Sequence, residues 1–522
     1  MRRTITKIRP SRTTPLRNIS GPRRSLATPA QARPDDAQIT TLPNKLRVVT
    51  EDKPGHFSSV GVYIDAGSRY ETARTSGASH LLDRMAFKST ENRDADEMSE
   101  AVNALGGQVT CASSRETMMY QSSHFQSVTP AAMSLLADTI RRSSFLPEEV
   151  AAQQEAVAYE VRELNAKPEM ILPEILHQVA YQNNTLGNPL LCPEERIPLV
   201  NRDLLAEYTR TWYRPDRMVV AGAGIAHSEL VRLAEEHFGD LTIPSPLSTS
   251  SSPSRSIPSH LLPPSPAASP SMYKSLTTAA SSLLGSRSTE EPSFEELISA
   301  KARYTGGHLF IHRPEEQFNH VYLAFEGVSI HDPDIYALAT IQILLGGGGS
   351  FSAGGPGKGM YSRLYTHVLN HHPAIDHCSS LHHIYADSSL FGIVGTSYTS
   401  LRPKDMLPTL VHQLSSLLYN PVGERELSRA KNQLMSSLVM ALESRAVEVE
   451  DLGRQVLVHG RRVSVAEMCE KIEQVTPKDL MRVAGRVFGT RVEGPPTLLV
   501  MGQEDIPDWQ KTMQQYGVGR MI

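Results

Sequence analysis

The sequence predicts an α+β protein built from two homologous α/β halves that form a clamshell and are joined by a Ser/Pro-rich linker. From Pro244 to Ser271, nineteen of twenty-eight residues are Ser or Pro, a composition that cannot bury enough apolar surface to offset its ordering entropy. The blocks on either side show the same order of strand and helix signals. A length of 522 residues is also typical of two or more domains.

The first block spans 38–242. Alternating and apolar positions predict a strand at Ser58–Asp65, and helical spacing follows at Ser76–Lys88. A proline and two acids open a long helix at Pro147–Leu164, since the helix dipole favours negative charge in the first turn. A short strand at Arg217–Ala221 closes the block.

The second block, 300–522, repeats this order after a disordered linker expected over 243–299. A strand at His320–Glu326 is followed by a helix at Pro333–Leu345, and a long helix is expected at Glu424–Met440. The strand at Thr497–Met501 corresponds to the one that closes the first block. The repeat indicates duplication, and a cleft between such halves is a usual place for a ligand.

The first residues, 1–34, carry nine Lys or Arg and no acid. Their content of Arg, Ser and Thr, without a long apolar core, is typical of a mitochondrial transit peptide, with a basic nucleic-acid-binding arm as the alternative. Cleavage after Leu26 would leave 44 basic against 56 acidic residues, a net charge near −12. An acidic mature chain favours a basic partner and argues against nucleic acid. We therefore expect the protein in the mitochondrial matrix.

The cysteines and apolar runs exclude other classes of protein. Four widely spaced cysteines without a CxxC pair indicate free thiols rather than a disulfide framework or a thiolate zinc site. No apolar run approaches the roughly 20 residues that a membrane-spanning helix needs. Any membrane association is thus expected only through a complex.

A glycine-rich stretch in the second block is the strongest candidate for function. Between Gly346 and Gly359, which we call the glycine strap, eight of fourteen residues are glycine. Glycine loses the most backbone entropy on ordering, so such a run is not there for stability. The apolar residues before it predict a helix ending at a glycine, and Met360–Asn370 shows helical spacing after it. We expect a side-chain-poor loop between two helices.

Three interpretations of the strap stay open at this point. A phosphate-binding loop fits poorly, because Ser352 replaces the first glycine of that motif and Gly359 replaces the hydroxyl residue after Lys358. The strap could be a plain connector. Alternatively, it lets an extended peptide lie against bare backbone. The substrate-binding candidates in this last case are Gly346, Gly347, Gly348, Gly349, Ser350, Gly354, Gly355, Gly357, Lys358 and Gly359.

The first block also contains a broken metal motif. His80, Asp83 and Arg84 follow the spacing of the inverted zinc motif H-x-x-E-H, but an aspartate and an arginine replace its glutamate and second histidine. Glu160 stands where a third ligand is expected. Because a catalytic zinc needs three protein ligands and a water, we expect no metal here. Arg84 should fill the metal position and pair with Glu160.

The chain resembles the pitrilysin/insulinase-like metallopeptidase family, in its non-catalytic members. Three stretches carry the resemblance: GVYIDAGSRYE at Gly61–Glu71, SHLLDRMAFKST at Ser79–Thr90, and the glycine strap. It covers nearly the whole chain outside the transit peptide and the Ser/Pro insert, which is a departure from the family. The resemblance implies a heterodimer in which a homologous catalytic beta subunit holds the zinc, while this chain's strap helps to capture basic presequence peptides of imported precursors. A core subunit of the respiratory cytochrome bc1 complex is the alternative.

Two further clusters of ionisable residues need interpretation. Glu448, Glu450 and Asp451 fall on one predicted helix, where they either form a solvated face or pair with presequence arginines. Five histidines gather within 371–383, but neighbours in a strand point to opposite faces. We therefore expect these histidines to pack or lie on the surface rather than bind metal.

Overall fold

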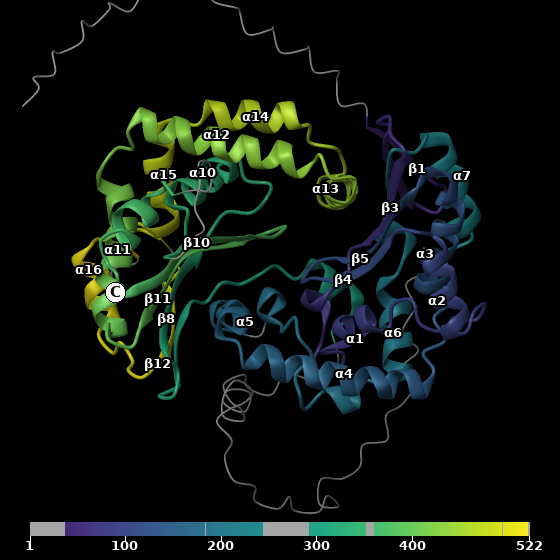
Figure 1. Cartoon of the computed structure of the whole chain (residues 1–522), viewed down its shortest axis with the longest axis horizontal. Helices are drawn as coiled ribbons and strands as arrows, with labels where there is room; N and C mark the ends of the chain where they lie inside the picture. The colour runs from purple at the N-terminus through teal and green to yellow at the C-terminus, as the bar shows by residue number, and fades with distance from the viewer. Residues whose placement is uncertain (1–36, 183, 244–291, 351–359, 493, 520–522) are drawn as a thin grey trace, which may run out of the picture. The chain divides into compact units, whose positions relative to one another are not determined.

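The computed structural model describes residues 37–519 except 183, 244–291, 351–359 and 493 (Figure 1). Two six-stranded mixed sheets form its framework, one in each half of the chain. The predicted transit peptide (1–34) and most of the predicted linker lie outside the described residues.

The first half is built on a sheet with the order β1-β2-β6-β3-β5-β4. All neighbours pair antiparallel except β2 and β6, which run parallel. Its strands are β1 (Gln38–Thr41), β2 (Arg47–Glu51), β3 (Phe57–Ile64), β4 (Gln108–Ser113), β5 (Met118–Phe125) and β6 (Met218–Ala223). Its helices are α1 (Ala78–Arg84), α2 (Ala95–Ala104), α3 (Thr129–Arg141), α4 (Pro147–Asn165), α5 (Pro168–Tyr181), α6 (Arg202–Trp212) and α7 (His227–Phe238).

The second half repeats this plan with the order β7-β12-β8-β11-β10-β9, in which only β7 and β12 run parallel. Its strands are β7 (Gly307–His312), β8 (Phe318–Glu326), β9 (Gly347–Gly349), β10 (Ile375–Ile384), β11 (Ser389–Tyr398) and β12 (Thr497–Gly502). Its helices are α10 (Ile335–Leu345), α11 (Pro403–Tyr419), α12 (Glu424–Ala441), α13 (Arg445–His459), α14 (Val465–Gln474), α15 (Pro477–Phe488) and α16 (Trp509–Gln515).

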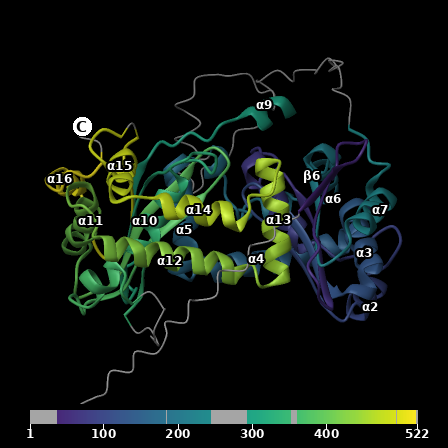
Figure 2. The same cartoon turned by 90° about the horizontal axis from the view of Figure 1, so that it is seen from above.

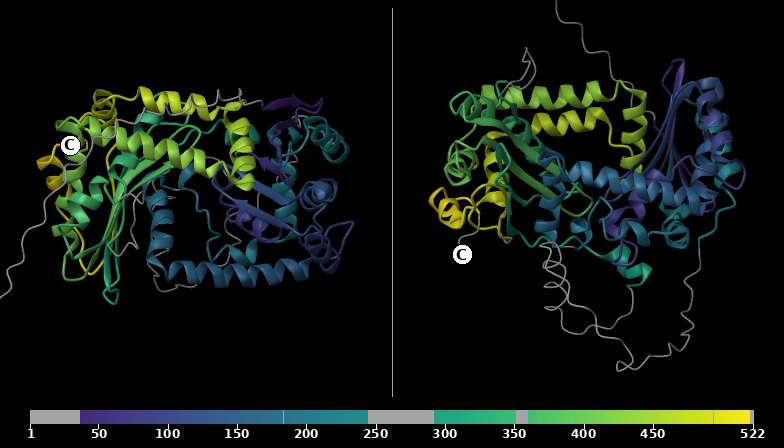
Figure 3. Two further views of the ribbon diagram at one scale, coloured as in Figure 1. Left: turned by 45° about the horizontal axis from the view of Figure 1, so that its top comes forward. Right: turned by 60° about the horizontal axis from the view of Figure 1, so that its bottom comes forward.

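One helix from each half packs on the sheet of the other half. Helix α13 packs Val449, Leu452 and Val456 on the first sheet, where they meet Tyr63 (Figure 2). Helix α5 packs Leu172, Ile175 and Leu176 on strands β8, β11 and β12 of the second sheet (Figure 3). These two apolar clusters come in addition to a separate core on the other face of each sheet. The exchange buries the sheet faces that would otherwise be exposed, which joins the halves through hydrophobic contact.

The predicted elements are present, with ends shifted by a few residues. The helix expected at Ser76–Lys88 is shorter, and Met360–Asn370 contains a π-helical turn at Leu364–Leu369 rather than an α-helix. The predicted linker extends too far at its end, because α9 (Phe294–Ser299) is ordered. A reciprocal capping box starts α9, and Phe294 packs on Trp212 with ring centroids 5.2 Å apart. The two α/β halves are thus confirmed, while the remaining domain boundaries and the clamshell closure stay predictions.

Candidate functional site

Helix α1, which carries the broken metal motif, is fixed by a buried carboxylate. Glu71 accepts hydrogen bonds from the backbone amides of Gly77 and Ser79, at 2.7 and 2.8 Å, and from the Ser79 hydroxyl at 2.6 Å. Gly77 has φ near +87°, and a Cβ there would lie 2.2 Å from the sulfur of Cys192. Only glycine fits this entry to the helix.

The metal position is occupied by an arginine side chain. Arg84 donates to both carboxylate oxygens of Glu160, from Nε at 2.8 Å and from Nη2 at 2.6 Å. The hydrogen bond and positive charge of Arg84 lower the pKa of Glu160, and the same bond raises the pKa of Arg84. The predicted pairing of these two residues is confirmed. A bidentate pair of this kind is strong and directional.

The remaining histidine is held neutral beside this pair. The backbone amide of Cys192 donates to Nδ1 of His80 at 3.1 Å, which leaves the proton on Nε2, 3.6 Å from Glu160. Burial lowers the pKa of His80. One neutral imidazole and a carboxylate already bound to a guanidinium do not fit a zinc ion, which would also be repelled by the Arg84 charge. In the described ranges no three His, Cys, Asp or Glu side chains are grouped to hold a metal.

Asp83 stands where the motif's general base would be, and it has a structural partner instead. Its carboxylate accepts from the backbone amide of Ser113 at 3.0 Å and lies 3.3 Å from the Ser113 hydroxyl. Ser113 ends strand β4, at the edge of the first sheet. Asp83 therefore ties helix α1 to that edge.

The start of the glycine strap is a strand, which corrects the prediction of a loop directly between two helices. Gly347–Gly349 form β9 and pair antiparallel with Ser379, Cys378 and His377 of β10, at the edge of the second sheet. Gly346 and Gly347 have φ near +56° and +104°. A Cβ on Gly347 would lie 2.0 Å from the Cys378 carbonyl oxygen. Close backbone approach therefore requires glycine at this end of the strap.

Side chains that follow the strap in sequence hold this strand in place. The backbone amide of Gly347 donates to the Ser362 hydroxyl at 3.0 Å, and the Tyr365 hydroxyl donates to the Gly349 carbonyl at 3.2 Å. Ser380 donates its backbone amide to the Gly346 carbonyl at 2.9 Å. Sequence reasoning missed these residues, because only the pairing of β9 with β10 brings them to the strap.

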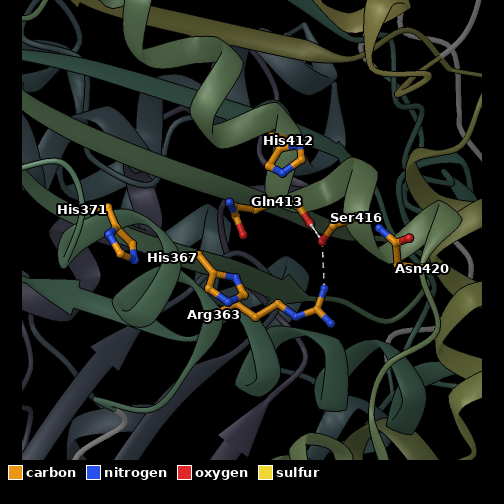
Figure 4. A pocket seen from close by; sticks show the side chains of 7 residues that line it. All are labelled: Arg363, His367, His371, His412, Gln413, Ser416 and Asn420. Carbon is orange, nitrogen blue, oxygen red and sulfur yellow. Dashed lines mark hydrogen bonds between the residues drawn. The ribbon is translucent and has the colours of Figure 1, made fainter.

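The other end of the strap is anchored through Arg363. Its guanidinium binds both oxygens of Glu426 on α12, at 2.7 and 3.0 Å. It also donates to Ser416 of α11 at 2.8 Å (Figure 4). Next to this anchor a hollow of about 480 Å³ is lined by Arg363, His367, His371, His412, Gln413, Ser416 and Asn420. A π-helical turn, a geometry often found at functional positions, begins at the next residue. Gly354, Gly355, Gly357, Lys358 and Gly359 lie outside the described residues.

Comparison with known proteins adds to this geometry. Residues 47–194 match the family described as "Insulinase (Peptidase family M16)", and residues 200–434 match "Peptidase M16 inactive domain". The chain is 46% identical to the "Mitochondrial-processing peptidase subunit alpha" of Neurospora crassa, over 95% of this chain and 94% of that one. The chain belongs to peptidase family M16. The predicted resemblance is confirmed.

More distant relatives of this M16 chain agree. It is 38% identical to the "Probable mitochondrial-processing peptidase subunit alpha" of Schizosaccharomyces pombe, over 93% of this chain and 90% of that one. The human "Mitochondrial-processing peptidase subunit alpha" is 34% identical, over 91% of this chain and 84% of that one. A chain of "Complex III2 from Candida albicans, Inz-5 bound" has a TM-score of 0.70 at 18% identity, covering 92% and 99% of the two chains. That likeness shows a shared fold.

The acids of α13 in this M16 chain all have cationic partners. Glu448 is 1% exposed and pairs with Lys53 at 2.5 Å and with Arg445 at 3.0 Å, so it does not lie on a solvated face. It instead links α13 to the loop after β2. Glu450 pairs with Arg454 at 3.0 Å, and Asp451 pairs with Arg462. A peptide arginine would have to compete with these internal partners.

The histidines near β10 pack as expected. His383 meets His177 of α5 edge to face, with ring centroids 5.0 Å apart, and the Tyr385 hydroxyl lies 2.8 Å from Nε2 of His177. Burial lowers the pKa of His382 to about 4. The predicted packing role is confirmed for these rings.

We expect the purified mature M16 chain, without any partner, to hold far less than one zinc per chain. The Arg84 guanidinium occupies the metal position and the motif lacks its second histidine. Elemental analysis after dialysis against buffer with trace zinc measures this, together with cleavage of a presequence peptide. One tightly bound zinc per chain, with cleavage lost on chelation, would instead identify an independently active peptidase.

Proposed function

We propose that this chain is the non-catalytic, substrate-recognising subunit of a heterodimeric zinc endopeptidase that removes presequences from imported mitochondrial precursors. The observation that carries the proposal is the combination of a metal position filled by Arg84 with a retained glycine strap. A chain that lacks three free zinc ligands does not activate water by the zinc-dependent route of this family. Close packing explains glycine at 346 and 347. The density of glycine in the rest of the strap has no stability rationale but suits close approach of a peptide backbone.

The proposal assigns the chemistry to a partner. A homologous beta subunit holds the catalytic zinc, and this chain captures the peptide with the strap, Gly346–Gly359. The names of the Neurospora, fission yeast and human relatives, each an alpha subunit of a processing peptidase, support this division. Glu450 and Asp451 are secondary peptide contacts in the proposal. Glu448 is not proposed as a peptide contact, because it already pairs with Lys53 of the first half and Arg445 of the second.

The proposal also includes where the chain is located and how it is processed. Residues 1–34 act as a transit peptide that is removed near Leu26, and the mature protein works in the mitochondrial matrix. Among the residues that the structure describes, no helix is both long enough and apolar enough to cross a membrane. The stretch at 244–291 links an N-terminal peptidase-like half, 38–242, to the C-terminal half.

A role as a core subunit of the respiratory cytochrome bc1 complex has weaker support. The likeness to a chain of a fungal Complex III2 is at 18% sequence identity and shows the fold alone. The Neurospora, fission yeast and human relatives, at 34–46% identity, carry processing-peptidase names. A scaffold role also gives no reason for the glycine density of the strap.

The test is reconstitution of the mature chain with the catalytic beta subunit. We expect cleavage of basic presequence peptides by the heterodimer and by neither subunit alone. Peptide affinity should fall as salt rises from about 50 to 500 mM, because screening shortens the reach of exposed charges to about 10 Å or less. Cleavage by the beta subunit alone at the full rate, or an affinity independent of salt, would contradict the proposal.

A further inference from the structure

The glycines in and just before β9 are not all required by the fold. Gly346 and Gly347 have positive φ, and a Cβ on either would lie within 2.5 Å of a neighbouring atom, the Ser362 Cβ or the Cys378 carbonyl oxygen. Gly349 has no such constraint: no described atom lies within 4 Å of its Cβ position. Folding therefore requires the first glycines but gives no reason for Gly349. With respect to the described atoms, its missing side chain leaves open space on the strand.

Ser350, the residue after Gly349, contacts an acid on a β-bulge, Asp376. Strand β10 pairs Ile375 with Ser397 and His377 with Thr396 of β11, so Asp376 is the extra residue between them. The carbonyl of Asp376 accepts the backbone amide of Ser350 at 2.6 Å. Bulges beside functional sites commonly re-aim one side chain, and here that side chain is a carboxylate.

Asp376 differs from the acids of α13 in its partners. Its Oδ1 atom accepts from the hydroxyls of Ser350, at 3.1 Å, and Tyr398, at 3.3 Å. No Lys or Arg in the described parts of the chain forms a salt bridge with it, whereas Glu450 and Asp451 each have an arginine. Within the described ranges only hydroxyl groups bind the Asp376 carboxylate, and they leave its negative charge in place. A cation from outside would thus displace no Lys or Arg that the structure describes.

Aromatic rings lie beside this charge. Tyr398, which is 39% exposed, faces Phe318 across the β8–β11 pair with ring centroids 5.1 Å apart. A guanidinium can bind a carboxylate and at the same time lie on an aromatic face, which a lysine ammonium does less well. The carboxylate of Asp376 and the ring of Tyr398 together favour an arginine over a lysine side chain.

We propose that Asp376, with Tyr398 beside it, receives an arginine side chain of the extended presequence peptide while the peptide backbone passes Gly349. This inference rests on the proposed function and names the specificity-determining residue at the strap. Asp376 is the main charged contact, and Glu450 and Asp451 stay secondary because they are internally paired. The ligand is a basic peptide with at least one arginine.

The test uses the reconstituted heterodimer and the variant Asp376→Asn, which keeps one side-chain oxygen to accept from Ser350 and Tyr398 and replaces the charged carboxylate by a neutral amide. We expect KM for an arginine-containing presequence peptide to rise about fivefold, since partly exposed ion pairs contribute up to about 1 kcal/mol, with kcat unchanged. For the same peptide with its arginines replaced by citrulline, variant and wild type should give equal KM values. Asp405→Asn, a surface acid of the same half paired with Arg402, is the matched control and should change neither value.

Substitutions in β9 give a second measurement. Gly349→Ala should leave the thermal unfolding midpoint unchanged but raise KM, whereas Gly347→Ala should lower the midpoint because of its contact with the Cys378 carbonyl. A Gly349→Ala variant with normal KM, or an Asp376→Asn effect that persists on the citrulline peptide, would overturn the inference. If residues 351–359 prove dispensable for processing, the proposed function fails instead. If they are needed and Asp376→Asn has no effect, only this inference fails.

Discussion

Deleting residues 351–359 should lower kcat/KM of the reconstituted heterodimer for presequence peptides about 100-fold, the scale expected when a substrate is no longer positioned at the catalytic group. The deletion spares β9, Ser362 and Arg363, which anchor the strap to β10, α12 and α11. Both sheets and their cores are untouched. The subunit should therefore fold and assemble but fail to hold the peptide at the zinc that the proposed function places in the beta subunit.

The deletion begins after β9 for a structural reason. Removing Gly347–Gly349 as well would take away an edge strand and its hydrogen bonds, so a loss of activity would have two explanations. A matched control deletes 255–263, nine residues of the Ser/Pro stretch, and should process at the normal rate. Thermal unfolding and size-exclusion chromatography check folding and assembly of both variants. Processing at the wild-type rate without 351–359 would mean that the strap is only a connector.

Replacing Arg69 by alanine should destabilise the chain by about 3–5 kcal/mol, the usual cost of removing one partner from a buried ion pair. The Arg69 side chain is 7% exposed and binds Glu116 of the first half at 2.6 Å and Asp387 of the second half at 2.5 Å. It also donates to the carbonyl of Ala300 at 3.0 Å. Burial acts to lower the pKa of Arg69, but the bond to Asp387 and the charge of Glu116 outweigh this and raise it. Without the guanidinium, two carboxylates would remain close together and unpaired.

Chemical denaturation followed by circular dichroism measures this effect. Arg232→Ala is the matched control, because Arg232 forms its pairs with Glu229 and Glu236 on the exposed surface of α7 and should leave the midpoint almost unchanged. Since Arg69 joins the halves, its loss should also slow processing in the heterodimer. Equal midpoints for the Arg69→Ala and Arg232→Ala variants would show that the buried pair adds nothing to stability.

Local sequence patterns were sufficient to predict the two repeated halves and to identify the broken metal motif. Strands β3 and β8 and helices α4, α10 and α12 lie within one or two residues of their predicted bounds, because apolar periodicity and helix-start signals act over short distances. The pairing of Arg84 with Glu160 also followed from sequence. An arginine that replaces a metal ligand needs a negatively charged partner. Glu160, at the expected position of the third ligand, supplies that charge.

The roles of individual residues at the strap were decided only by tertiary contacts. The sequence shows a run of glycines, but the close approach of Cys378 is what requires glycine at 347 and not at 349. Likewise, Glu448 and Asp376 are both acids near apolar residues in sequence. Glu448 pairs with Lys53 and Arg445, whereas the described partners of the Asp376 carboxylate are hydroxyl groups. The exchange of α5 and α13 between the halves, which fixes these partners, joins residues hundreds of positions apart. Local propensity acts within a few residues, whereas charge pairing and steric exclusion depend on which distant segments meet in space.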